Sequence, residues 1–205
     1  MTYTCDWPLF LALNFDGGPA MDGFMKCVSA MWTWLPFYLL MLWLVWRRVG
    51  LRAMLCFVAA AVLAVVLSDM VAGIFKHAGL LKNLWPSFPP RLRPMFTEEL
   101  AGQIHIPYPG GGLYGTVSAH AATDAAIALL ASAVIRRRWF SWTAAAWFLL
   151  VAYSRIYLAK HFPIDLLLGA VTGATVGGAL YGVWLQAVKR WRGEAGGRKE
   201  PPIAK

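Results

Sequence analysis

AMLCFVAAAVLAVVLSDMVAGIF, residues 53–75, is apolar apart from Ser68 and Asp69. It exceeds the roughly 20 residues that a helix needs to cross about 30 Å of hydrocarbon. The composition of the whole chain agrees, because 59% of its residues are hydrophobic, only 14% are charged and the mean hydropathy is +0.55. Soluble domains carry more charge and less apolar surface. The sequence therefore predicts a membrane protein.

Four further apolar runs occupy residues 27–46, 121–135, 139–153 and 166–188. The two shorter runs reach spanning length when flanking residues are included. We therefore expect an all-α integral membrane protein with a bundle of about five transmembrane helices.

A shorter apolar stretch, residues 7–15, precedes these runs and ends at a turn-forming Asp-Gly-Gly-Pro. It is too short to span, and we expect an N-terminal interfacial helix. A cleaved signal peptide fits less well, because the chain start lacks basic residues and carries Asp6.

Basic residues orient the predicted bundle, because short cytoplasmic loops collect Lys and Arg. Three clusters fall on one side: Arg47, Arg48 and Arg52; Arg136, Arg137 and Arg138; and Lys189, Arg190, Arg192, Arg198, Lys199 and Lys205. This pattern predicts a multi-pass protein of the cell inner (cytoplasmic) membrane with its C-terminus in the cytoplasm. The net charge of +9 is then mainly a topology signal, and no nucleic-acid partner is expected.

We divide the chain into an interfacial segment (1–23), a transmembrane domain (24–190) and a basic tail (191–205) that we expect to be disordered. An outer loop, residues 76–116, is rich in proline and glycine, and loops of this length are usually functional. The three cysteines have neither CxxC nor metal-ligand spacing. No metal or other cofactor is expected, and the sequence leaves the oligomeric state open.

Further basic residues lie on the predicted outer side, against the usual bias. Those that the topology places there are Lys76, Lys82, Arg91, Arg93, Arg155 and Lys160. Such a patch indicates an anionic ligand, and three polar segments (91–94, 110–122 and 154–165) meet on this side.

These segments resemble the signature motifs of the type 2 phosphatidic acid phosphatase (PAP2) superfamily, the membrane lipid phosphatases related to vanadium haloperoxidases. The third motif, SR-x5-H-x3-D, matches in full at Ser154, Arg155, His161 and Asp165. The second keeps Ser118 and His120 of PSGH but has Val117 and Ala119 at the other positions. The first has Arg93-Pro94, and its lysine is either Lys82, at a longer spacing than K-x6-RP, or Lys76. The resemblance implies a PAP2/haloperoxidase-like helical core.

The same residues suit phosphoryl transfer, which needs cations on the phosphate oxygens, an in-line nucleophile and an acid for the leaving oxygen. Arg93, Arg155 and one lysine form a cationic cradle, to which Ser118 adds a neutral donor at a helix start. This cradle needs no metal.

Two histidines are assigned by their neighbours. His161 lies four residues before Asp165, which can hold one ring nitrogen while the other attacks to form a phosphohistidine. His120 is then the general acid, with Asp124 four residues further on to tune it. His77 and His105 are expected at the membrane interface, and Asp69 as a structural partner. Glycines of residues 169–178 are expected to pack closely against another helix.

The expected substrate is a lipid phosphate or diphosphate whose head reaches the outer basic residues from the bilayer. Gly-Gly-x-Tyr-Gly before Ser118 and His-Ala-Ala after it are similar to bacterial family members that act on undecaprenyl diphosphate, which makes this lipid the leading substrate. Phosphatidylglycerophosphate, phosphatidic acid and lipid A phosphates are alternatives. Two alternatives belong to other functional classes: a transporter or flippase, and a catalytically silent lipid-binding scaffold. A transporter would favour internal repeats, and none is seen here.

Overall fold

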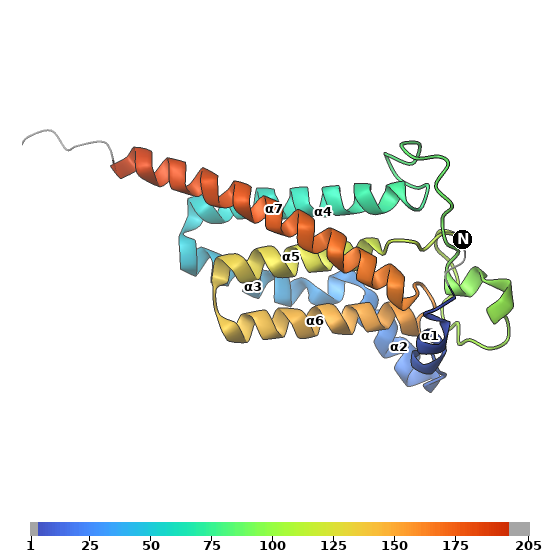
Figure 1. Cartoon of the computed structure of the whole chain (residues 1–205). Helices are drawn as coiled ribbons and strands as arrows, with labels where there is room; N and C mark the ends of the chain where they lie inside the picture. The colour runs from blue at the N-terminus through green and yellow to red at the C-terminus, as the bar shows by residue number, and fades with distance from the viewer. Residues whose placement is uncertain (1–3, 197–205) are drawn as a thin grey trace, which may run out of the picture.

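The computed structural model describes residues 4–196 as helices joined by loops (Figure 1). The α-helices are α1 (Trp7–Leu13), α2 (Gly18–Ser29), α3 (Leu35–Val49), α4 (Leu51–Ile74), α5 (Ala119–Ile135), α6 (Arg138–Tyr157) and α7 (Pro163–Gly196). Three short 3-10 helices complete them: η1 (Met31–Trp34), η2 (Pro94–Phe96) and η3 (Glu98–Leu100). The predicted all-α class is therefore confirmed for the described residues.

The helix α5 is the centre of the bundle and packs against α3, α4, α6 and, most extensively, α7. Its buried face is built from small residues such as Ala122 and Ala126. A methyl group added to Gly177 of α7 would lie 2.6 Å from the carbonyl oxygen of Ala126, and Gly173 is closer still to Ala122. Small residues on both helices thus let the two backbones approach. Close packing of these α7 glycines is confirmed, whereas Gly178 faces open space.

The first predicted span is not one continuous helix. Residues 27–46 are divided between α2 and the stretch Met31–Val49, which comprises η1 and α3, and the two are bent by 70° relative to each other at Ala30. Ala30 is extended, and Pro36 in the first turn of α3 cannot donate a helical hydrogen bond. The Trp34 indole N–H donates to the carbonyl oxygen of Val28 at 2.8 Å, so this carbonyl at the end of α2 has a hydrogen-bond partner. The sequence did not predict this bend, because the apolar run continues through it.

The expected count of about five spans is not confirmed. By length and apolarity α4 and residues 163–191 of α7 could cross a membrane, and the bent pair α2–α3 adds a third span if it counts as one. The apolar helix α5 is shorter than a full span. The helix α5 has 17 residues, and the last turn of α6 carries the charged Arg155. Nevertheless α3 to α7 run side by side in Figure 1.

One described residue from each of the three basic clusters lies at the same end of this bundle. Arg48, Arg136 and Lys189, one from each cluster, line a common cavity of about 320 Å³. Figure 1 shows the long loop, α1 and the start of α7 at the opposite end. The helix α7 continues to Gly196, and the part of the expected tail at residues 197–205 lies outside the described residues.

The N-terminal helix α1 packs on the protein at this second end. Phe10 is fully buried and meets the ring of Phe162 edge-on at 5.0 Å between centroids. Asn14, at the end of α1, donates to the carbonyl oxygens of Ile156 (3.1 Å) and Tyr157 (2.8 Å) and accepts from the His105 N–H at 2.8 Å. The helix α1 is thereby joined to the end of α6.

We expect Gly173→Ala to lower the free energy of unfolding by about 1–3 kcal/mol, because the added methyl group would force α7 away from the α5 backbone. Gly178→Ala is the matched control on the same helix, where the methyl group meets open space. Thermal unfolding of both variants in detergent measures the effect. Equal melting temperatures for the two variants would show that the α5–α7 contact tolerates a larger residue.

Candidate active site

The long loop folds back on itself to reach the site. The Arg93 N–H donates to the Leu113 carbonyl at 3.0 Å, and the Gly115 N–H donates to the Arg91 carbonyl at 2.8 Å. Residues 91–93 and 113–115 therefore run antiparallel, with a bridge between Leu92 and Tyr114. This pairing carries the first and second motifs to the place where α6 ends and α7 begins.

The third motif forms the buried floor of the site. His161 is 2% exposed, and its Nδ1 lies 3.7 Å from Oδ2 of Asp165, as the i,i+4 spacing predicts. The same carboxylate oxygen accepts the Phe162 N–H at 2.9 Å, so the residues leading into α7 hold it in place. The Asp165 carbonyl accepts the Ser118 N–H at 3.0 Å and thereby ties the start of α5 to α7.

Burial keeps His161 neutral. It lowers the pKa of the imidazole well below its usual value, and the charges of Arg155, Arg93, Lys76 and His120 add to that shift. A neutral imidazole has the free electron pair that a nucleophile needs. The same four neighbours show that residues from α5, α6, the outer loop and the turn after α4 converge on His161.

Two arginines and a lysine supply the positive charge of the site. One terminal nitrogen of Arg155 donates to the Ser29 hydroxyl, while its Nε is buried without a hydrogen-bond partner among the described residues. Arg93 Nε donates to the Tyr114 carbonyl at 3.3 Å. Burial lowers the pKa of Lys76, an effect that the charge of Asp69 opposes and those of Arg93 and Arg155 increase.

Lys76 and Lys82, the two lysines considered for the first motif, occupy different places. Lys76 lies in the turn after α4 and is half-buried within reach of the charges of the site. Lys82 is exposed in the outer loop and is not among the charges that act on His161. The structure thus brings Lys76, and not Lys82, to the other site residues.

A further lysine, Lys160, holds the glycine-rich part of the loop. Its ammonium group donates to the carbonyl oxygens of Tyr108 and Gly110, each at 2.7 Å. Burial lowers its pKa to about 8, and the charges of Arg155 and Arg93 contribute. Lys160 is therefore a loop anchor next to the cationic site.

The second motif stands at the start of α5. Ser118 is fully buried, and its hydroxyl accepts the Ala121 N–H at 3.3 Å as an N-cap. His120 lines an otherwise mostly apolar cavity of about 490 Å³, together with Ser29, Asp69 and Asp124. The predicted neighbours His120 and Asp124 thus share a cavity wall, and Asp69 faces the same space.

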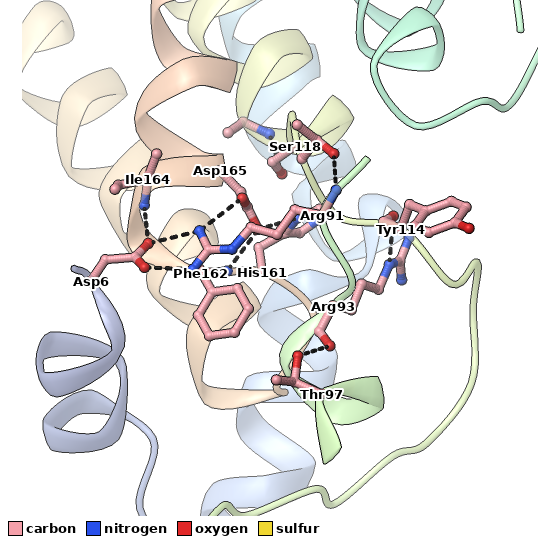
Figure 2. A network of polar contacts seen from close by, with 12 residues as sticks. Asp6, Arg91, Arg93, Thr97, Tyr114, Ser118, His161, Phe162, Ile164 and Asp165 are labelled. Carbon is pink, nitrogen blue, oxygen red and sulfur yellow. Dashed lines mark hydrogen bonds and ion pairs between the residues drawn. The ribbon is translucent and has the colours of Figure 1, made fainter. Parts of the chain in front are cut away.

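The ion pair of Arg91 with Asp6 was not predicted from the sequence, which placed Arg91 only in the outer basic patch. Arg91 is 2% exposed, and its guanidinium contacts both oxygens of Asp6 at 2.5 and 3.0 Å (Figure 2). It also lies 3.4 Å from Oδ1 of Asp165 and 3.8 Å from the centre of the Phe162 ring. The doubled arginine in Arg-Leu-Arg-Pro was the available signal, while Asp6 had none.

His105 belongs to a separate polar group near the start of α2. Its Nε2 lies 2.7 Å from an oxygen of Asp22, which also accepts from the Tyr157 hydroxyl at 2.6 Å. Asp16, Asp22 and His105 offer ligand atoms within 4.8 Å of one another, the one group of this kind found among residues 4–196. His105 is therefore a hydrogen-bonded link between the loop and α2, and more than an interfacial residue. His77, the other histidine expected at the interface, is half-buried just after Lys76.

Comparison with known proteins agrees with this geometry. Residues 55–189 match the PAP2 superfamily. The lipid A 4'-phosphatase of Porphyromonas gingivalis is 32% identical over 185 residues, which cover 90% of this chain and 75% of that protein. The lipid A 4'-phosphatase of Bacteroides thetaiotaomicron is 29% identical over 181 residues, which cover 88% of this chain and 74% of that protein.

A solved structure shares the fold. The crystal structure of LpxE from Aquifex aeolicus superposes with a TM-score of 0.62 at 20% identity, covering 91% of this chain and 99% of that one. The chain therefore belongs to the PAP2 superfamily. Within it, this protein is a membrane lipid phosphatase, a phosphoric ester hydrolase rather than a transporter. The expectation of undecaprenyl diphosphate as the leading substrate is not supported, because the relatives are lipid A phosphatases.

We expect Gly115→Ala to lower kcat by about tenfold to a hundredfold, because small displacements of reacting groups are costly. The added methyl group would lie 3.1 Å from Asp165 Oδ2, 3.3 Å from Arg93 Cγ and 3.5 Å from His161 Nδ1. Gly112→Ala in the same loop is the control, since the nearest atom, on Arg93, is 3.9 Å away. Steady-state kinetics with a soluble aryl phosphate measures both. An unchanged kcat in Gly115→Ala would show that the site adapts to the methyl group.

Proposed function

We propose that this protein hydrolyses a phosphate monoester of a lipid A-type glycolipid and releases phosphate through a phosphohistidine on His161. The observation that carries the proposal is the buried His161–Asp165 pair under the charges of Lys76, Arg93 and Arg155. The names of the two curated relatives favour a lipid A phosphate over the other lipid phosphates.

In the proposed first step, Nε2 of His161 attacks phosphorus while Nδ1 keeps its proton toward Asp165. The bond from phosphorus to the ester oxygen breaks, and His120 gives that oxygen a proton. Lys76, Arg93 and Arg155 neutralise the three remaining phosphate oxygens, and the unpartnered Nε of Arg155 suits one of them.

In the second step, His120 accepts a proton from water as the water oxygen attacks the phosphohistidine. The phosphorus–nitrogen bond breaks, inorganic phosphate leaves, and the neutral imidazole of His161 is restored. Every catalytic group in this cycle is a residue of the chain. The three cations take the place that a metal ion has in many other phosphatases.

The cavity next to His120 supports a lipid substrate. Its wall is mainly apolar, with Tyr38, Met41, Phe57 and Val62 among its residues, and its volume of about 490 Å³ suits an acyl chain. Asp69 and Asp124 add two carboxylates to the cavity wall that His120 also lines. These carboxylates would accept hydrogen bonds from the N–H or O–H groups of a sugar headgroup. A polyprenyl chain has no such groups.

We also propose that the site faces the outer, periplasmic side of the inner membrane. Arg48, Arg136 and Lys189, one described residue from each basic cluster, line a common cavity at the opposite end of the bundle. Because basic residues mark the cytoplasmic side, the long loop and His161 would lie outside.

The substrate is tested with purified protein in detergent. We expect phosphate release from lipid A in excess EDTA at the rate seen without EDTA, and slower release from undecaprenyl diphosphate and phosphatidic acid. A lipid A lacking the 4'-phosphate separates the two phosphate positions. Preference for undecaprenyl diphosphate would overturn the glycolipid assignment, and loss of activity in EDTA that a divalent ion restores would overturn the metal-free mechanism.

The histidine roles are separated by the leaving group. His161→Ala should abolish turnover of both a lipid phosphate and nitrophenyl phosphate, together with any acid-labile phosphoenzyme. His120→Ala should lose about 10²–10⁴ in rate on the lipid and much less on nitrophenyl phosphate, whose leaving oxygen needs no acid. The opposite pattern, with the aryl substrate rescuing His161→Ala, would mean that the two roles are reversed.

A further inference from the structure

A buried row of charges runs from the N-terminal segment to the nucleophile. Asp6 contacts Arg91, Arg91 contacts Asp165, and Asp165 lies 3.7 Å from His161 (Figure 2). Asp6, Arg91 and Asp165 are each at most 5% exposed. Charges in such surroundings act on one another with little screening.

The net charge of this row matches the reaction. When both carboxyl groups are ionised, Asp6, Arg91 and Asp165 together carry one net negative charge beside His161. Phosphorylation of Nε2 makes the imidazole ring cationic, so one negative charge is needed next to it. Without Asp6, the charge of Arg91 would cancel that of Asp165.

The geometry also orients the Asp165 carboxylate. Arg91 lies 3.4 Å from Oδ1, whereas Oδ2 accepts the Phe162 N–H and faces His161. Arg91 is itself fixed, because its N–H donates to the Thr116 hydroxyl at 2.8 Å and its guanidinium lies over the Phe162 ring.

Asp6 is held in the same way from the side of α7. One of its oxygens accepts the Ile164 N–H at 3.0 Å in the first turn of that helix. The contacts of Asp6 and Arg91 therefore fix the turn that carries His161 and the carboxylate that faces it.

We propose that Asp6 and Arg91 are positioning residues for the phosphoryl transfer, with Asp6 offsetting the charge of Arg91 so that Asp165 can stabilise the phosphorylated His161. The segment before α1 is then part of the catalytic unit. This inference rests on the role proposed above for His161.

The test compares Asp6→Asn, Asp6→Glu and Asp16→Asn in the full-length protein with nitrophenyl phosphate. Asp6→Asn should lower kcat and the rate of phosphoenzyme formation by about tenfold or more, with KM within about twofold, because only the charged intermediate is affected. Asp6→Glu should recover part of the loss by keeping the charge. Asp16, an exposed carboxylate between α1 and α2, provides the matched control and should leave kcat unchanged.

A double-mutant cycle with Arg91→Gln separates this role from simple loss of stability. If the two residues act as one unit, the Asp6→Asn/Arg91→Gln variant should lose no more kcat than the more impaired single variant. A wild-type kcat in folded Asp6→Asn, or losses that multiply in the double variant, would overturn the inference. A wild-type protein that forms no phosphohistidine would instead overturn the proposed function.

Discussion

The contacts of Asp165 hold the site together. Its side chain accepts the Phe162 N–H and meets Arg91, and its carbonyl accepts the N–H of Ser118 at the start of α5. One residue thus joins the outer loop, the second motif and the first turn of α7. Because a buried carboxylate is stable only when it is paired, the partners of Asp165 determine how these three segments meet around His161.

This arrangement requires a rigid frame, which the α5–α7 contact supplies. His120 lies in the first turn of α5 and His161 lies just before the start of α7, so their separation depends on how closely the two backbones pack. Gly169 approaches the Ser118 carbonyl directly below the site, and the contact continues along α7 through Gly173 and Gly177. In a lipid environment, where apolar side chains gain little by leaving the bilayer, close backbone packing is the main means of holding helices in register.

The concentration of cations around His161 is costly for the protein alone and useful for its reaction. Lys76, Arg93 and Arg155 are at least half-buried, and their charges repel one another. A phosphate monoester brings the compensating negative charge, so binding relieves repulsion that folding created. The same cations disfavour a protonated His161 and so keep the proposed nucleophile in its reactive form.

The sequence by itself determined the helical membrane class and the His161–Asp165 pairing, because hydrophobic runs and an i,i+4 spacing act locally along the chain. The phosphatase chemistry was implied by the resemblance of its motifs to the PAP2 superfamily. The tertiary structure decided which lysine joins the site, where the first span bends, and that Arg91 pairs with Asp6. Whether Lys76 or Lys82 reaches the site depends on how the loop folds. Asp6 contacts Arg91 although 85 positions of sequence separate them. Contacts of that range depend on how loops close over packed helices, which residue spacing does not encode.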